Sequence, residues 1–187
     1  MVLKIEVGCG ANKKEGYVRC DLEAKVNPDY VFNAEKDKWP FKDDSVDEVL
    51  SENLCEHLQD LDHYMQEAWR VLKKDGKLTI LVPYFKHKGA VADPDHVRFF
   101  CEDSMMFYDK TCLGSDKRPV DRGAVDFETT LITFNFDSRI LEKLGVDVQV
   151  AFKEIDKHRD CIDFLKFDMK AVKPLRIGGA SGLSQDK

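Results

Sequence analysis

The chain has 187 residues, 43% of them hydrophobic and 34% charged, which is enough for one domain with a substantial core. Its formal net charge is −6, from 35 acidic against 29 basic residues, and this argues against bulk electrostatic binding to nucleic acid. No apolar stretch approaches the roughly 20 residues that cross a bilayer, and a predicted strand begins almost at once, so neither a membrane anchor nor a signal peptide is expected.

Predicted strands and helices alternate along the first half of the chain, a pattern typical of a parallel sheet with helices on its faces. The helix is predicted over Leu61–Lys73, because apolar residues recur there at i, i+3 and i+4. Lys73, Lys74 and Gly76 supply the charges and the stop of its C-terminal end. The predicted strands are Leu3–Val7, Tyr17–Asp21, Tyr30–Asn33, Val46–Ser51 and Lys77–Val82.

The second half of the chain is less regular. Residues 84–100 are rich in Gly, Pro, His and Asp, which predicts a long functional loop. Asp137 or Ser138 is expected to cap a short helix. The other expected elements are a short helix over Glu102–Tyr108, a mobile connection over Leu113–Ala124, strands over Phe127–Phe136, Val148–Ile155 and Phe164–Val172, and a helix over Ser138–Leu144. We expect residues 1–175 to form one domain and residues 176–187 to be a flexible tail.

A glycine-rich turn, Gly8-Cys9-Gly10, follows the first predicted strand. Glycines allow backbone N–H groups to approach a ligand that a Cβ would push away. Asp21 stands at the tip of the next strand, where a carboxylate can accept hydrogen bonds from two ribose hydroxyls. Together these residues predict a pocket for an adenosine-bearing cofactor. A nicotinamide cofactor is disfavoured, because the G-x-G-x-x-G spacing is broken and the third glycine comes only at Gly16.

Read together with the segments that follow, this turn resembles that of a class I S-adenosylmethionine-dependent methyltransferase of the compact type-11 subgroup. Four runs over about residues 3–85 carry the resemblance: IEVGCG with the later Asp21, then WPFKDDSVDEVL, EHL and EAWRVLKKDGKL. The resemblance implies an α/β, Rossmann-like three-layer sandwich. Its seven-stranded, mostly parallel sheet would have the order 3-2-1-4-5-7-6, and its cofactor would be S-adenosylmethionine.

The resemblance also assigns a cofactor site. The glycine turn would wrap the methionine part of the cofactor, Glu6 would steady that turn, and the carbonyl of Ser51 would meet the methionine ammonium. The residues assigned to cofactor binding are Glu6, Gly8, Cys9, Gly10, Asp21, Leu22, Asn33, Ala34 and Ser51.

At the other end of the cofactor, Asp21 would hold the ribose hydroxyls. Asn33 stands where the family often has an Asp facing the adenine amino group, and an Asn can still accept that bond through its carbonyl oxygen. Ala34 would give a backbone contact to the ring.

The chain departs from the family in its first crossover. Only ten residues separate Gly10 from Asp21, whereas a crossover between parallel strands needs a dozen or more. The first helix is therefore expected to be shortened or missing, and the helix that usually precedes the first strand is absent too. We expect an open cofactor site, covered by the substrate, a partner chain or a second copy.

The candidate catalytic residues are His96 first and His57 second. His96 follows the fifth predicted strand, and active sites of open α/β sheets lie at the carboxyl ends of strands. An imidazole there can act as general base for a hydroxyl or an amine. Two structural alternatives stand beside this one: His96 and Arg98 pin the loop by hydrogen bonds to Asp93 or Asp95, and His57 helps to start a helix.

A metal-assisted alternative also uses these residues. Some methyltransferases that act on hydroxyls bind a divalent ion through E-x-x-E-H and a later His, which correspond here to Asn53, Glu56, His57 and His96. Because Asn53 replaces a charged ligand, no residue is assigned to a metal, and whether an ion assists through the other three stays open.

The sequence thus predicts an enzyme that moves the methyl group of S-adenosylmethionine to a nucleophilic acceptor, with a small molecule or a sugar favoured. The alternative is a non-catalytic S-adenosylmethionine-binding module or partner subunit with the same fold. Six cysteines without CxxC spacing indicate reduced thiols and hence a cytoplasmic protein.

Overall fold

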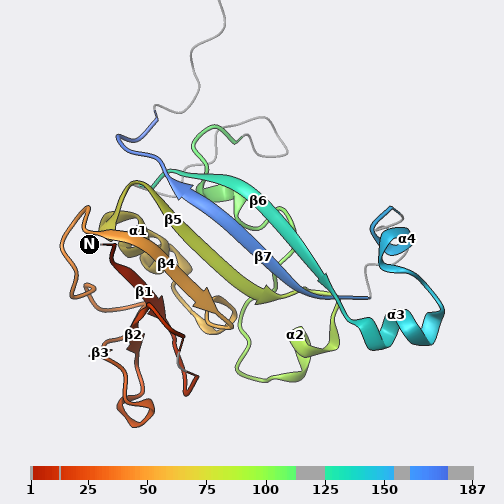
Figure 1. Ribbon diagram of the computed structural model, residues 1–187. Coiled ribbons are helices and arrows are strands. Elements are labelled where there is room, and N and C mark those ends of the chain that lie inside the picture. The colour runs from red at the N-terminus through yellow and green to blue at the C-terminus, as the bar shows by residue number, and fades with distance from the viewer. Residues whose placement is uncertain (1, 13, 113–124, 154–160, 177–187) are drawn as a thin grey trace, which may run out of the picture.

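A computed structural model describes residues 2–12, 14–112, 125–153 and 161–176. Seven strands of this described part form one sheet in the order β3-β2-β1-β4-β5-β7-β6, which confirms the predicted topology (Figure 1). Neighbours from β3 to β5 pair in parallel, and β7 pairs antiparallel with both β5 and β6. The strands are β1 (Lys4–Val7), β2 (Val18–Asp21), β3 (Tyr30–Val31), β4 (Val46–Glu52), β5 (Leu72–Pro83), β6 (Phe127–Phe136) and β7 (Ile162–Ala171).

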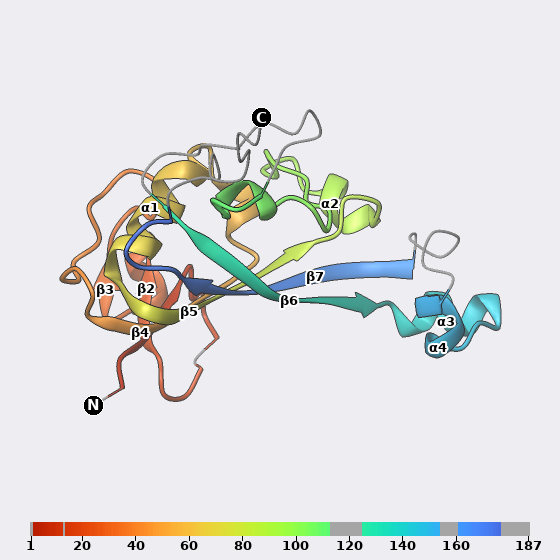
Figure 2. The same cartoon turned by 90° about the horizontal axis from the view of Figure 1, so that it is seen from above.

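Helices α1 and α2 lie on the same side of the sheet, whereas α3 and α4 lie beyond the far ends of β6 and β7 (Figure 2). The predicted cap of α3 is Asp137, whose carboxylate accepts a hydrogen bond from the backbone N–H of Arg139 at 2.9 Å. None of the described helices is long and apolar enough to span a bilayer. The helices are α1 (Leu61–Val71), α2 (Lys88–Ala92), α3 (Ser138–Leu144) and α4 (Val148–Lys153), with short 3-10 turns η1 (Ala24–Val26), η2 (Cys55–His57) and η3 (Met106–Tyr108).

The prediction of a strand over Val148–Ile155 is wrong, because Val148–Lys153 forms α4. The run looks β-like in the sequence, but Asp147 provides a helix start that outweighs this tendency. Its carboxylate accepts from the N–H of Gln149 at 2.7 Å, and its carbonyl accepts from the N–H of Ala151 at 2.9 Å.

The boundary between α1 and β5 also differs from the prediction. The helix ends at Val71 rather than Lys73, and Leu72 already pairs with Val46 of β4. Residues 73–76 then bulge out of the strand, and regular pairing resumes where Lys77 meets Glu48. The predicted strand start at Lys77 is therefore the start of the regular pairing.

Two other segments differ from the prediction: one contains an unexpected helix, and in the other the expected helix is shorter. The loop over residues 84–100 contains the helix α2, and the helix expected over Glu102–Tyr108 is reduced to η3. Leu113–Ala124 and residues 177–187 lie outside the described residues. Arg176, where the expected tail begins, is anchored by a bond from its guanidinium to Asp126 at 2.6 Å.

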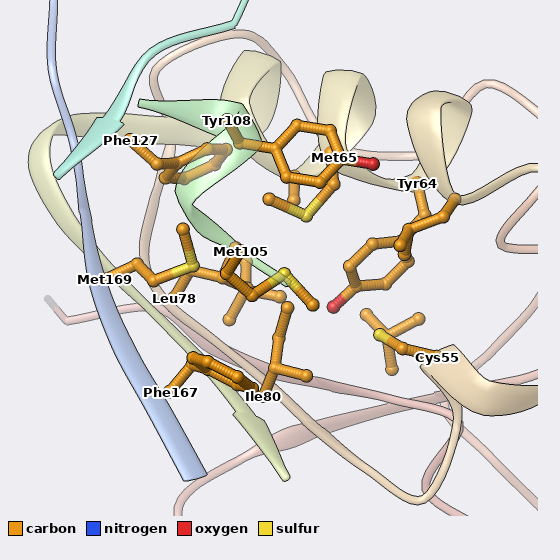
Figure 3. Packing of buried hydrophobic residues seen from close by; sticks show 14 of the residues in the cluster. Cys55, Tyr64, Met65, Leu78, Ile80, Met105, Tyr108, Phe127, Phe167 and Met169 are labelled. Atoms are coloured by element: carbon orange, nitrogen blue, oxygen red, sulfur yellow. The ribbon is translucent and has the colours of Figure 1, made fainter. Parts of the chain in front are cut away.

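The core lies between the sheet and α1. Tyr64 and Met65 of α1 and Met105 just before η3 pack onto the apolar face of the strands, which includes Ile80 and Phe167 (Figure 3). All five side chains are completely buried. Successive side chains of a strand point to opposite faces of the sheet, so every second side chain of β1, β4, β5 and β7 lies on the face away from this core.

That opposite face, which we call the polar face, carries a ladder of charges where a three-layer sandwich would place a covering helix. Lys4 lies 2.8 Å from Glu48, and Lys77 lies 3.1 Å from Asp168. The described part of the connection between β1 and β2 contains no helix, which confirms that the first helix is missing. Tyr17 from this connection donates to Glu48 at 2.6 Å, so a loop covers this part of the sheet instead. Charged side chains on the polar face include Lys4, Glu6, Glu48, Glu52, Lys77, Lys166, Asp168 and Lys170.

Candidate functional site

A cleft of about 300 Å³ opens where β1, β2 and β4 end at the same edge of the sheet (Figure 1). It brings together six of the nine residues that the sequence assigned to cofactor binding: Gly8, Gly10, Asp21, Leu22, Asn33 and Ala34. Apolar walls come from Phe32 and Leu54, which no sequence signal singled out, and from Leu58 of the run EHL. The carboxyl ends of parallel strands are the expected place for a ligand in this class of sheet.

The glycine turn is built for close approach. Gly8 and Gly10 have φ of +74° and +55°, the left-handed region that favours glycine. The N–H groups of Gly8 and Cys9 both donate to the carbonyl of Cys20, at 2.9 and 3.1 Å, which ties the turn to β2. A Cβ on Gly8 would lie only 2.9 Å from Cδ1 of Leu54. The space between the turn and Leu54 is therefore too small for any side chain at position 8.

Replacing Gly8 by alanine is expected to cost more stability than replacing Gly10. Both substitutions put a Cβ into the left-handed region, which costs about 1–2 kcal/mol. At Gly10 the added methyl meets no described atom within 4 Å, whereas at Gly8 it meets Leu54 and adds about 1–3 kcal/mol of overpacking. Urea unfolding followed by circular dichroism measures both variants, and equal losses would contradict the proposed contact.

Asp21 stands at the end of β2 with its carboxylate turned to the glycine turn. One oxygen accepts from the N–H of Gly10 at 2.8 Å, and the other accepts from the N–H of Glu23 at 2.9 Å. A carboxylate has about four acceptor sites, so two remain for a ligand with paired hydroxyls. The neighbouring Leu22 is 60% exposed, an apolar surface available for a flat ring.

Asn33 is only partly available for the role assigned to it. Its side-chain oxygen accepts from the N–H of Glu35 at 2.9 Å, so this oxygen keeps one acceptor site and the amide NH₂ remains as a donor. The carbonyl of Ala34 is engaged by the indole N–H of Trp39 at 3.1 Å. Both residues nevertheless line the cleft.

The other three assigned residues, Glu6, Cys9 and Ser51, are buried and do not line the cleft. Burial raises the pKa of the Glu6 carboxyl and of the Cys9 thiol. The hydroxyl of Ser51 lies 2.6 Å from that of Tyr64 in the core. The assignment of these three residues to cofactor binding stays a prediction.

A second cavity, also of about 300 Å³, adjoins the cleft. The two share Asn53 and His57, which sit just beyond β4. His96 and His87 line only the second cavity, with Pro83 and Phe164 as apolar walls. Of the two candidate catalytic residues, His57 therefore faces both spaces and His96 faces the second.

Hydrogen bonds to the turn after β4 bring His96 to this cavity. The N–H groups of Val97 and Arg98 both donate to the carbonyl of Glu56, at 2.9 and 3.2 Å. The guanidinium of Arg98 donates to the carbonyl of Leu58 at 2.8 Å, which confirms that Arg98 pins the loop, although through a carbonyl and not through Asp93. As a result the rings of His57 and His96 lie 4.6 Å apart.

Both histidines have one ring nitrogen committed to the backbone. Nδ1 of His96 lies 2.9 Å from the carbonyl of Ala90, and Nδ1 of His57 lies 3.2 Å from the carbonyl of Asp95. Because a carbonyl only accepts, Nδ1 carries the hydrogen in each neutral ring and Nε2 keeps its lone pair. Each Nε2 can therefore accept a proton or a cation.

Glu56 is among the residues that line the second cavity, although it is only 1% exposed. Neither of its carboxyl oxygens has a hydrogen-bond partner among the described residues. Burial raises the pKa of this carboxyl, and the two histidines act in the opposite direction. The sequence could suggest Glu56 as a ligand but not that its oxygens have no partner, since that depends on the packing around it.

Comparison with known proteins supports a methyltransferase fold. A type-11 family model described as a methyltransferase domain matches residues 5–80, the region that carries the sequence resemblance, and confirms it. No curated protein matches the sequence.

Solved structures match over nearly the whole chain. A methyltransferase from Archaeoglobus fulgidus described as S-adenosylmethionine-dependent superposes with a TM-score of 0.63 at 17% identity, covering 90% of this chain and 86% of that one. A Haloferax volcanii methyltransferase, solved in complex with the Trm112 activator, gives 0.55 at 16% identity, covering 91% and 83%. Phosphoethanolamine N-methyltransferase 2 of Haemonchus contortus, solved with S-adenosylmethionine, gives 0.54 at 17% identity, covering 94% of this chain and 50% of that one. At these identities the likeness shows a shared fold.

Proposed function

We propose that this chain, which has the fold of the class I S-adenosylmethionine-dependent methyltransferases, transfers the methyl group of that cofactor to a small-molecule or sugar acceptor. The proposal rests on the observation that the cleft and the second cavity adjoin each other. The cleft at Gly8 and Asp21 suits a nucleoside, and the second cavity is lined by three histidines.

The residues of the cleft fit S-adenosylmethionine from end to end. Asp21 has acceptor sites left for the ribose hydroxyls, Leu22 offers an apolar surface to adenine, and the turn with Gly8 and Gly10 lines the cleft where the methionine part would lie. The bound cofactor supplies a methyl group on a positively charged sulfur, which a nucleophile attacks in line. The protein must therefore align the acceptor and exclude water, so positioning is its main contribution.

The second cavity is the proposed place of the acceptor. Pro83 and Phe164 give it apolar walls, and His57 stands at the boundary with the cleft. His96 presents Nε2 to this space, where it can receive the proton that a hydroxyl acceptor loses. We assign His96 as the first catalytic residue and His57 as the second.

Calorimetry with S-adenosylmethionine and with S-adenosylhomocysteine tests the cofactor part of the proposal. Folded protein is expected to bind both compounds. Incubation with methyl-labelled cofactor and a fractionated cell extract then reveals the acceptor by the label it gains. Absence of binding by a well-folded sample would overturn the proposed function.

Substitution of His96 by alanine is expected to lower the rate of methyl transfer about 100-fold and to leave cofactor affinity within about twofold, since general base catalysis is typically worth 10²–10⁴. The matched control is His63→Ala, because His63 lies on α1, bonds the carbonyl of Asp37 at 2.9 Å and lines neither space. The rate is measured by the formation of S-adenosylhomocysteine, and an unchanged rate in the His96 variant would remove it from the mechanism.

A second candidate function is a non-catalytic S-adenosylmethionine-binding module or partner subunit. The missing first helix favours it, because the site is then left open for a partner chain or a second copy to cover. The structural neighbour solved with the Trm112 activator shows that this fold can associate with a partner. Retention of S-adenosylhomocysteine without any consumption of the methyl donor distinguishes this candidate from the enzyme.

We also place the protein in the cytoplasm. Cys9, Cys20 and Cys55 are buried thiols, as expected in a reducing compartment. With a net charge of −6 the protein is not expected to bind nucleic acid in bulk.

A further inference from the structure

The strongest unexplained feature of the second cavity is Glu56. Its side chain is 1% exposed, and both carboxyl oxygens are shielded from solvent without a hydrogen-bond partner among the described residues. Buried polar groups are almost always hydrogen-bonded, and a buried carboxylate in particular is paired with a cation or bound to a metal. A carboxyl kept in this position therefore indicates a missing positive partner.

Two imidazoles face the same point. One ligand atom each from Glu56, His57 and His96 lies within 4.8 Å of the other two. In both rings Nδ1 is held by a backbone carbonyl, of Asp95 for His57 and of Ala90 for His96, which leaves Nε2 to bind a cation; a carboxylate oxygen of Asp93 lies 3.9 Å from Nε2 of His96. Such outer hydrogen bonds are the usual means by which proteins fix the ring orientation of metal-binding histidines.

The backbone also holds the three residues together. His57 follows Glu56 in η2, and the carbonyl of Glu56 accepts the N–H groups of Val97 and Arg98, the two residues after His96. The loop that carries His96 cannot move away without breaking these bonds and those of the Arg98 guanidinium to Leu58. The cluster is therefore preorganised by the fold.

We propose that Glu56, His57 and His96 bind a divalent first-row transition ion, with zinc preferred. Two imidazole nitrogens and one carboxylate oxygen suit zinc and its neighbours, whereas magnesium and calcium prefer oxygen ligands alone. At zinc–ligand distances near 2.1 Å, tetrahedral ligand atoms lie about 3.4 Å apart, so the side chains must draw together by about 1 Å. Three protein ligands leave a position open towards the second cavity.

The inference rests on the proposed function and narrows its acceptor to a compound with a hydroxyl group. A hydroxyl oxygen beside the cation loses its proton more readily, and that proton passes to solvent. The oxygen then forms a bond to the methyl carbon while the bond from that carbon to the cofactor sulfur breaks, leaving a methyl ether and S-adenosylhomocysteine. In this scheme His57 and His96 act as ligands, and the cation takes over the task of the general base.

An ammonium group of an amine acceptor is the competing occupant, because it too would neutralise Glu56. The metal is favoured because a bound ammonium has no lone pair to attack the methyl group. The two imidazole lone pairs are also better partners for a transition ion than for a group that must give up its proton.

The test is a titration of chelator-treated full-length protein with Co²⁺, followed by visible absorption, and with Zn²⁺, followed by calorimetry. One equivalent is expected to bind to the wild-type protein and to His63→Ala, the control histidine on α1. Glu56→Gln keeps the size of the side chain, and this variant and His96→Ala are each expected to lose about 100-fold or more in affinity for the ion.

Three results would overturn the inference: no ion bound by the wild-type protein, equal binding by the Glu56→Gln variant, or saturation of the cluster by methylammonium with no effect of Zn²⁺. Calorimetry with S-adenosylmethionine on the same samples shows whether each variant is folded and keeps its cofactor site. A protein that binds the cofactor but no ion retains the proposed function and loses the metal site. A folded protein that binds no cofactor loses the proposed function itself.

Discussion

An Asp21→Ala variant is expected to bind S-adenosylmethionine about 100-fold more weakly than the wild-type protein, or worse. The carboxylate has two acceptor sites left for the ribose hydroxyls, and each bond to a charged acceptor contributes about 1.5–3 kcal/mol. A 100-fold loss corresponds to about 2.8 kcal/mol, so the loss of both bonds accounts for it. The substitution also releases the N–H of Gly10, which loosens the turn that cradles the methionine part.

Two further variants separate these effects in the same calorimetric titration. Asp21→Asn keeps one acceptor oxygen and is expected to fall between the wild-type protein and the alanine variant. Asp29→Ala is the matched control, because Asp29 also accepts a backbone bond, from Arg19 at 2.7 Å, but does not line the cleft. Unchanged affinity in Asp21→Ala would show that the nucleoside does not bind at this strand end.

Replacing Arg70 by alanine is expected to lower the free energy of unfolding by about 3 kcal/mol, since removing one partner of a buried pair typically costs 3–5 kcal/mol and this pair is not fully buried. Arg70 is 18% exposed and donates to Glu67 at 2.8 and 2.6 Å. It also donates to the carbonyls of Trp39 and Phe41, at 3.0 and 2.9 Å. Glu67 in turn accepts from the N–H of Trp39 at 2.7 Å, so this one network attaches the segment before β4 to α1.

Urea unfolding measures this loss against two controls. Arg70→Lys keeps the charge but not the fork of donors, and is expected to recover only part of the stability. Arg139→Ala removes another arginine that forms two bonds to a carboxylate, on Asp137, but Arg139 is 83% exposed, so its loss should lower the stability much less. Equal losses of stability from Arg70→Ala and Arg139→Ala would show that the network around Trp39 does not stabilise the folded protein.

The same network determines how the stability of the protein changes with pH. Burial alone would raise the pKa of Glu67, but the bonds from Arg70 and Trp39 outweigh it and lower that pKa below its ordinary value. A carboxyl whose pKa is lower in the folded state contributes stability above its unfolded pKa and loses that contribution as the pH falls through the folded value. Acid should therefore destabilise the wild-type protein more steeply than the Arg70→Ala variant.

The motif that carried the sequence resemblance has a structural explanation in this network. Glu67 and Arg70 belong to the run EAWRVLKKDGKL, and Trp39 begins the run WPFKDDSVDEVL. Their hydrogen bonds join the two runs and attach the connection between β3 and β4, which contains no helix in the described structure, to α1. The sheet order was predictable only through the family resemblance, whereas the cleft at Gly8 and Asp21 was predictable because short-range patterns determine strand ends and turns.

Features that depend on tertiary packing were not predictable. Ser51 is at the end of a strand, as expected, but its hydroxyl is directed to Tyr64 in the core. A helix replaces the expected strand at Val148 because Asp147 caps it. The isolation of the Glu56 carboxyl follows from what packs around it, and no local pattern of residues carries that information.

The charge ladder on the polar face explains how this fold can exist without one of its helix layers. Where the strands alternate between apolar and ionised side chains, water itself can serve as the covering layer, and the helix that ordinarily excludes it becomes dispensable. Cohesion of the central strands then comes from a single dry interface, the one with α1. A side chain lost from that interface has no opposite layer to compensate for it.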